Sequence, residues 1–93
     1  MSRKIEFRPA PRMELEEAVA WYERQRPGLG AELDVELHSV LEQIRNTPGR
    51  FAKVTSRVRK ARLKRFRVYS IYFIESDAII RVIAVWHGKR DPE

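Results

Sequence analysis

The spacing of apolar residues changes once in the body of this chain, at Asn46–Gly49, and this change constrains the fold. Before it, apolar residues recur every three or four positions in a segment from Pro9 to near Gln25, and again from Leu33 to Ile44, which is the period of an amphipathic helix. After it, β-branched and aromatic residues gather in short runs, which is typical of strands. The pattern therefore predicts an α+β domain.

The two helical segments are separated only by Arg26–Gly30, a run with one proline and two glycines. So short a turn predicts an antiparallel helical hairpin. Each helix has one apolar stripe that we expect to face the core. The stripes consist of Leu15, Ala18, Val19 and Tyr22 in the first helix and Leu33, Leu37, Val40, Leu41 and Ile44 in the second.

Four segments have the pattern of strands. They are Lys4–Arg8, Val58–Arg65, Val68–Glu75 and Ala78–His87. The first precedes the helices and the other three follow them, and Ser76-Asp77 forms a hairpin turn between the last two. We therefore expect a single domain over residues 1–93, in the order β-α-α-β-β-β, with the helical hairpin packed on a mostly antiparallel four-stranded sheet.

Basic residues are concentrated in the second half of the chain. The whole chain has a formal charge of +6, but residues 1–47 sum to −2 and residues 48–93 to +8. Lys60, Arg62 and Lys64 alternate along one predicted strand, so their side chains share a face at intervals of ~6.6–7 Å, close to the spacing of phosphates in a nucleic-acid strand. The pattern predicts an anionic partner.

Several kinds of chemistry are excluded or unsupported by the composition. The chain has no cysteine, which excludes disulfides and thiolate metal sites, and two scattered histidines do not predict a metal site. No glycine-rich phosphate loop is present, and we expect no cofactor. The absence of cysteine also favours an intracellular, cytoplasmic protein. The apolar stretches are much shorter than the ~20 residues of a membrane span, so we expect a soluble protein that does not bind membranes.

The two histidines have different settings. His38 falls on the polar side of the second helix, where we expect it to be solvated. His87 ends the last strand, and it is either an acid/base or phosphate-binding group or a structural residue that bonds the backbone. By strict alternation Arg81 shares a face of this strand with His87, but the two are ~20 Å apart.

Blocks of this sequence resemble the RelE/ParE superfamily of type II toxins, also called plasmid-stabilisation proteins. Glu16–Glu23 and Arg26–Glu32 are similar to the helical hairpin of that family, and Val58–Phe66, Tyr69–Phe73 and Ala84–Pro92 are similar to its strands. Together they cover nearly the whole chain in the family's order. The resemblance implies a toxin that a cognate antitoxin neutralises.

Two details of the resemblance bear on structure and activity. Where the family has Phe-Pro-Tyr at the entrance of a strand, this chain has Phe66–Tyr69, which lacks the proline and is one residue longer, and a bulge there would absorb the extra residue. The ending His87–Pro92 resembles the ParE-like branch, whose members poison DNA gyrase, whereas RelE-like members cut messenger RNA on the ribosome.

The resemblance and the charge pattern together indicate two binding surfaces. A gyrase poison needs a surface and no catalytic group, and we expect that surface to comprise Arg59, Lys60, Arg62, Lys64, Lys89 and Arg90. The antitoxin would contribute an acidic, amphipathic segment. We expect it to contact Leu15, Tyr22, Leu37, Val40, Lys60 and Arg62.

Two alternatives remain open from the sequence. One is a metal-independent, ribosome-dependent endoribonuclease, for which the candidate catalytic residues are His87, Arg62, Arg65, Arg81 and Tyr72. That reaction requires a base, an acid and an arginine within hydrogen-bond reach of one phosphate. The other alternative is a basic nucleic-acid-binding module without toxicity.

Overall fold

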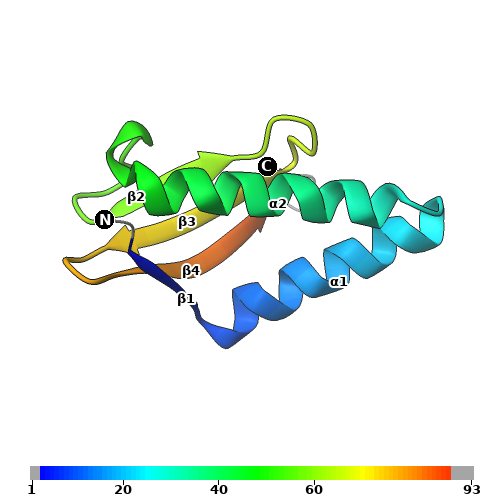
Figure 1. Cartoon of the computed structure of the whole chain (residues 1–93), viewed down its shortest axis with the longest axis horizontal. Coiled ribbons are helices and arrows are strands. Elements are labelled where there is room, and N and C mark those ends of the chain that lie inside the picture. The colour runs from blue at the N-terminus through cyan, green and yellow to red at the C-terminus, as the bar shows by residue number, and fades with distance from the viewer. Residues whose placement is uncertain (1–2, 89–93) are drawn as a thin grey trace.

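The computed structural model describes residues 3–88. Its elements follow the predicted order β-α-α-β-β-β (Figure 1). They are β1 (Lys4–Phe7), α1 (Pro9–Gln25), α2 (Leu29–Asn46), the short 3-10 helix η1 (Pro48–Arg50), β2 (Val58–Arg62), β3 (Tyr69–Glu75) and β4 (Ile79–His87). No helix in this part of the chain is long and apolar enough to cross a membrane.

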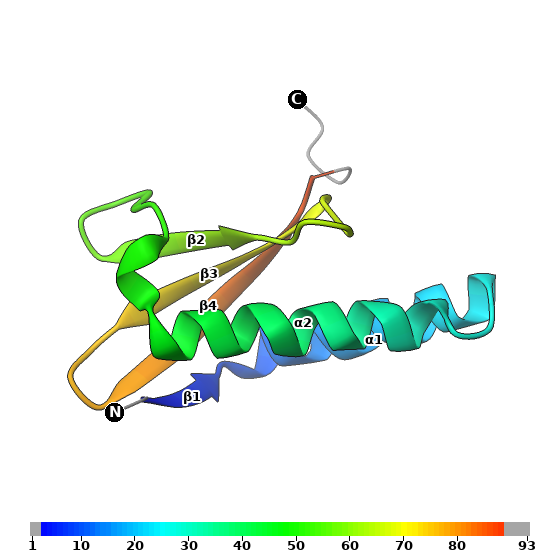
Figure 2. The same ribbon diagram turned by 45° about the horizontal axis from the view of Figure 1, so that its top comes forward.

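The four strands form one sheet in the order β1-β4-β3-β2. β1 is parallel to β4, and the other two pairs are antiparallel, so the expected α+β fold is confirmed. Figure 2 shows α1 and α2 side by side on one face of the sheet. We call the face against the helices the inner face and the opposite one the outer face.

The core lies between the helical hairpin and the inner face. The helical stripes predicted from the sequence supply one side of it, because Leu15, Leu33 and Ile44 are buried. The sheet supplies the other side through alternate residues of its strands, among them Ile71 and Phe73 of β3. Burial of these side chains is the dominant favourable contribution to folding.

The helical hairpin is closed by Glu23 at the end of α1. Its carboxylate accepts hydrogen bonds from the backbone N–H groups of Gly28, at 2.8 Å, and Gly30, at 3.0 Å. The hydrogen bond from Gly28 is the largest of the effects that set the pKa of Glu23, which lies below its ordinary value. Gly28 has φ of 92°, a left-handed conformation that favours glycine. In this turn Gly28 provides the left-handed backbone conformation, and Gly30 allows close contact with Val19 and Glu23 of α1.

The strand predicted over Val58–Arg65 is shorter than expected, because β2 ends at Arg62. The alternating pattern continues in the sequence, with Leu63 buried and Lys64 exposed, but the backbone leaves the sheet. β3 begins at Tyr69, one residue later than predicted. The intervening residues form a loop that accommodates the extra residue, and the irregularity of the sheet lies elsewhere.

A bulge interrupts the pairing of β3 with β4 in the middle of both strands. Tyr72 pairs with Ala84, whereas the next residue, Phe73, pairs with Val82, so Ile83 is an extra residue in β4. The prediction of a bulge at the entrance of β3 is therefore wrong, because the bulge lies in β4, opposite Tyr72 and Phe73. One extra residue reverses which face the rest of the strand presents.

The bulge contradicts the prediction that Arg81 and His87 share a face. Arg81 pairs with Ile74 and lies on the outer face, next to Glu6 of β1. His87 pairs with Tyr69 and lies on the inner face. The two residues are on opposite sides of the sheet because strict alternation fails at the bulge.

Candidate functional site

Three backbone N–H groups of the loop of residues 63–68, which we call the basic loop, bind one carboxylate of α2. Glu36 accepts hydrogen bonds from the backbone N–H groups of Lys64 at 2.6 Å, Arg65 at 2.9 Å and Phe66 at 3.1 Å. Three successive N–H groups that converge on one anion form the kind of concavity known as a nest. Sequence reasoning missed Glu36, because nothing local to it marks a contact 28–30 residues away.

The charge of Glu36 is stabilised by this contact. Partial burial by itself raises the pKa of this carboxyl, but the hydrogen bonds from the three amides and the positive charge of Arg65 outweigh it. The net result is a pKa below the ordinary value. Glu36 is therefore ionised at neutral pH, and the basic loop is fixed to α2 under those conditions.

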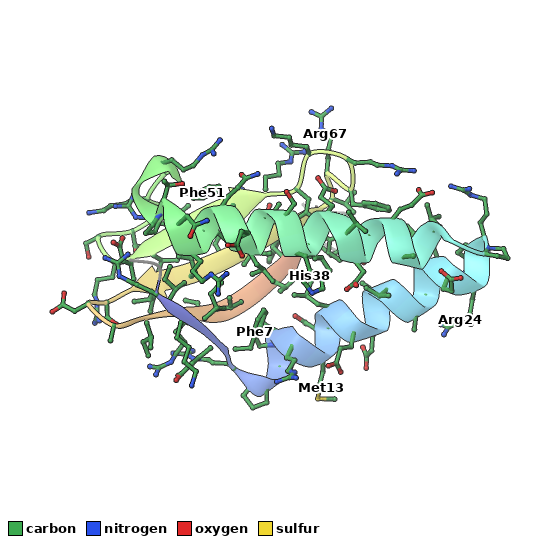
Figure 3. All side chains as sticks on the ribbon, viewed as in Figure 1. Phe7, Met13, Arg24, His38, Phe51 and Arg67 are labelled. Atoms are coloured by element: carbon green, nitrogen blue, oxygen red, sulfur yellow. The ribbon has the colours of Figure 1, made fainter. Side chains whose placement is uncertain are left out.

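Further contacts fix the ends of the basic loop. The Arg62 guanidinium donates from Nε to the backbone oxygen of Arg67 at 2.9 Å, which joins the end of β2 to the end of the loop. Arg65 forms an ion pair with Glu32 of α2, and its guanidinium carbon lies 5.3 Å from the centroid of the Phe66 ring. The loop thus presents Lys64 and Arg67 on a rigid frame, and Figure 3 shows Arg67 projecting from it.

Lys60 and Arg62 lie on the outer face of β2, next to Lys64 and Arg67 of the basic loop, and we call these four residues the positive surface. The pairing places Lys60 beside Tyr72 and Arg62 beside Ser70. The Lys60 ammonium lies 5.9 Å from the centroid of the Tyr72 ring, within range of a cation–π contact. The predicted alternation of basic residues holds for these two, whereas Lys64 belongs to the loop rather than to the strand.

Two parts of the predicted target surface differ from the rest. Arg59 points to the inner side, where it donates to the backbone oxygen of Phe51 at 2.6 Å and lies 3.5 Å from the carboxylate of Glu75. Its side chain is only 19% exposed, so it holds the fold together and we leave it out of the surface proposed below. Lys89 and Arg90 lie outside the described residues.

His87 lines a pocket at the inner side of the sheet end. Its ring meets the Tyr69 ring edge to face, with centroids 4.8 Å apart. The pocket has a volume of about 560 Å³, and Trp21, Tyr22 and Arg24 of α1 form its other wall. His87 is therefore an inward-facing residue packed against aromatic side chains.

The five candidate ribonuclease residues are dispersed in this fold. Tyr72, Arg62 and Arg81 lie on the outer face, whereas His87 lies on the inner face and Arg65 belongs to the basic loop. On the outer face, Arg62 and Arg81 pair with residues four positions apart on β3, which is ~13 Å along the strand. The sheet brings no base, acid and arginine of this set to one point.

A groove lies between the two helices, with a volume of about 410 Å³. Apolar side chains form its floor, and they are Phe7, Leu15, Val19, Leu37 and Leu41. Charged and polar groups form its rim, including His38, which Figure 3 labels together with Phe7. The rim includes an Arg12–Glu16 ion pair at 3.4 Å. An apolar floor with a polar rim is suited to an amphipathic helix.

The residues predicted to contact an antitoxin do not form one surface. Leu15 and Leu37 line the groove, but Tyr22 lines the pocket that contains His87, and Val40 is buried in the core. Lys60 and Arg62 lie on the outer face of the sheet. Helical periodicity indicated which side chains leave the solvent, but it did not indicate whether they enter the core or a groove.

Residues 3–88 contain no cluster of three or more metal-ligating side chains. Two surfaces form the candidate site: a positive surface on β2 and the basic loop, and an apolar groove between the helices.

A sequence model described as "ParE toxin of type II toxin-antitoxin system, parDE" matches residues 5–92. This chain belongs to the ParE toxin family. The predicted superfamily and its ParE-like branch are confirmed. As a ParE toxin, the chain is the toxin component of a type II toxin–antitoxin system, and this context implies an antitoxin partner.

The ParE fold is also evident in a comparison with solved structures. This ParE-family chain is similar to a chain of the chromosomal ParDE TA system from P. aeruginosa, with a TM-score of 0.76 at 12% sequence identity. The match covers 92% of this chain and 96% of that one. At this identity the similarity concerns the fold alone. A search of curated proteins gives no match.

Proposed function

We propose that this ParE-family toxin poisons DNA gyrase and that a cognate antitoxin neutralises it by filling the groove between the helices. Membership of the ParE family supports a toxin. The observation that favours gyrase over message cleavage is that His87 and Arg81 lie on opposite faces of the sheet. Because gyrase acts on chromosomal DNA, the proposal places the protein in the cytoplasm.

Metal-independent RNA cleavage needs converging groups that this sheet keeps apart. A base must remove the 2′-hydroxyl proton, an acid must protonate the leaving oxygen, and a cation must stabilise the crowded phosphorane. The guanidinium of Arg81 is 3.1 Å from the carboxylate of Glu6, and His87 is on the other side of the sheet. A poison requires only a surface that binds the enzyme–DNA complex.

The positive surface meets that requirement. Lys60, Arg62, Lys64 and Arg67 extend from the outer face of β2 to the basic loop, and the Glu36 contact holds the loop in place. Clustered positive charge steers a protein towards an anionic partner and accelerates association. The partner we propose is the DNA-bound form of gyrase.

Assays on purified toxin test the proposed target. We expect the wild type to inhibit supercoiling by gyrase and to trap cleaved DNA, without cleaving message in a reconstituted translation system. His87→Ala should keep this inhibition, because His87 faces inward. Arg62→Ala should require at least about tenfold more toxin, because it removes one charged contact with the target and also the bond to Arg67 that fixes the end of the loop.

The matched control is Arg24→Ala, which removes an exposed arginine from α1, away from the positive surface (Figure 3). This variant should inhibit gyrase as the wild type does. Message cleavage that His87→Ala abolishes, with supercoiling unaffected by any variant, would contradict the proposal and favour the ribonuclease.

The groove between the helices is the proposed antitoxin site. Leu41→Glu should weaken antitoxin binding at least tenfold, because the partner's apolar face would then bury a charge. In the free toxin this carboxylate can reach solvent, since Leu41 is only half buried, so toxicity should remain. The measurement is binding by calorimetry, together with rescue of growth on co-expression.

Val35→Glu is the control for this change. Val35 is 70% exposed on the same helix and does not line the groove. It should leave antitoxin binding unchanged. Equal binding by Leu41→Glu and Val35→Glu would exclude the groove as the antitoxin site.

A further inference from the structure

The outer face of the sheet has aromatic residues beside its basic ones, and the proposed function does not explain these aromatic residues. The helices cover only the inner face (Figure 2). The pairing of the strands assigns a mixture of basic, aromatic and small residues to the outer face. In the half of the sheet next to the basic loop these are Lys60, Arg62, Ser70, Tyr72, Ala84 and Trp86.

These residues form two rows across the strands. In the first row, Lys60 of β2 pairs with Tyr72 of β3, which pairs with Ala84 of β4. In the second row, Arg62 of β2 is joined through Ser70 of β3 to Trp86 of β4. Each row thus contains one basic residue, one aromatic residue and one small residue.

The aromatic side chains of the two rows are available to a ligand. Trp86 is 44% exposed. Tyr72 is half buried with the Lys60 ammonium 5.9 Å from its ring centroid, and Ala84 on its other side is too small to cover that ring. Tyr72 and Trp86 are diagonal neighbours, for which a separation of ~7–8 Å is usual. The basic residues Lys60 and Arg62 are two positions apart on β2, ~7 Å, close to the spacing of successive phosphates.

The bulge in β4 is what turns Trp86 outward. Arg81 lies on the outer face, and strict alternation from it would direct Trp86 towards the helices. The extra residue Ile83 reverses the second half of the strand. A bulge often redirects a side chain in this way near a functional site.

We propose that the outer face binds single-stranded nucleic acid, with bases stacked on Tyr72 and Trp86 and phosphates contacted by Lys60 and Arg62. Flat aromatic platforms beside a basic track are how sequence-tolerant single-strand binding is achieved. A duplex keeps its base faces stacked on each other, so it cannot use these rings. An apolar protein partner would not match a face on which each row ends in a cation.

The proposal extends beyond the proposed target, and its test contains neither gyrase nor antitoxin. The chain has two tryptophans, so Trp21→Phe leaves Trp86 as the single indole reporter. Titration of this protein with dT and rU 12-mers should quench its emission saturably, whereas a 12-base-pair duplex should quench far less. Quenching by the dT oligomer alone would assign the site to single-stranded DNA, and quenching by the rU oligomer alone would assign it to single-stranded RNA. Quenching by both would mean that the site accepts either nucleic acid. Each of these results supports the proposal.

Substitutions then locate the site, with binding of the oligomer to each variant measured by fluorescence anisotropy. Trp86→Ala should weaken binding about 5- to 150-fold, the effect of one lost base stack. Trp21→Ala removes the other exposed tryptophan, which is on α1, and should leave binding unchanged. Lys60→Gln and Arg62→Gln should each reduce the slope of log K against log salt by ~0.7. Circular dichroism checks that each variant is folded.

Three results would overturn the proposal. They are an unquenched Trp86 at saturation, equal losses with Trp86→Ala and Trp21→Ala, and tighter binding of duplex than of single strands. None of them bears on gyrase inhibition, so failure of this proposal is distinguishable from failure of the proposed function.

Discussion

Gly30→Ala is expected to lower the free energy of unfolding by about 2–3 kcal/mol, the cost typical of an overpacked contact. A Cβ atom at Gly30 would lie 2.4 Å from the backbone oxygen of Val19 and 2.9 Å from the Cβ atom of Glu23. A backbone oxygen in the middle of α1 cannot rotate away, so the two helices must separate. Urea unfolding followed by circular dichroism measures the change.

Gly49→Ala is the matched control. A Cβ atom there has no neighbour within 4 Å, and the backbone is not left-handed, so stability should change by no more than about 0.5 kcal/mol. Equal effects at both glycines would show that the hairpin tolerates a wider separation than its geometry indicates. Because the helices also form the groove, Gly30→Ala should weaken antitoxin binding as well.

Glu36→Gln is expected to lower the free energy of unfolding by about 2 kcal/mol. Three charge-assisted hydrogen bonds in a fully buried site would contribute more, but solvent reaches this carboxylate and weakens them. The amide has a single acceptor oxygen and presents an NH₂ group to loop amides that are themselves donors. The basic loop should therefore detach from α2. Hydrogen exchange of the amides of residues 64–66 and urea unfolding at pH 7 measure the two effects.

The contribution of Glu36 depends on pH with a definite sign. Its pKa is lowered in the folded protein, so its stabilising effect is complete above the ordinary value of 4.5 and is lost as the pH falls through the folded value. Wild type and Glu36→Gln should differ in stability at pH 7 and converge in strong acid. A difference that persists unchanged at low pH would mean that charge has no part in the contact.

Glu42→Gln is a suitable control for this series. Glu42 is on the same helix, but its partners are the neighbouring side chains of Arg45 and Asn46 at the surface, not the backbone of a distant loop. The change should be much smaller than at Glu36 and should leave hydrogen exchange in the basic loop unaltered.

The order of elements followed from the sequence because each element has its own repeating pattern. The stripes that include Leu15 and Leu33 have the helical period, and both residues are buried. The strands around Ile71 and Ile80 are rich in β-branched and aromatic residues, and these two side chains are fully buried. Burial of one face of each element is what produces such periods, so they are visible locally.

The end of β2 was not predictable from the same reasoning. Ala61 and Leu63 alternate as in a strand, and both are buried. The backbone leaves the sheet where Glu36, far away in the chain, accepts hydrogen bonds from the amides of Lys64, Arg65 and Phe66. A tertiary contact of this kind leaves no mark in the local pattern.

The faces of β4 were not predictable either. The residues from Val82 to Val85 are all apolar, so no polar position marks which of them is skipped by the partner strand. The sequence therefore identified His87 and Arg81 as candidates but could not assign their sides of the sheet. The same ambiguity concealed Trp86 as an outward-facing residue.

The extra residue Ile83 also affects how this chain can be compared with its relatives. An alignment of this chain with a ParE toxin whose last strand lacks the bulge must contain a one-residue gap. This gap belongs between Val82, which pairs with Phe73, and Val85, which pairs with Ile71. At 12% identity, sequence similarity gives little guidance on where that gap belongs. If it is placed after His87, this histidine is equated with a residue that faces the opposite side. Functional residues should therefore be transferred between such toxins by sheet register, not by position in the chain.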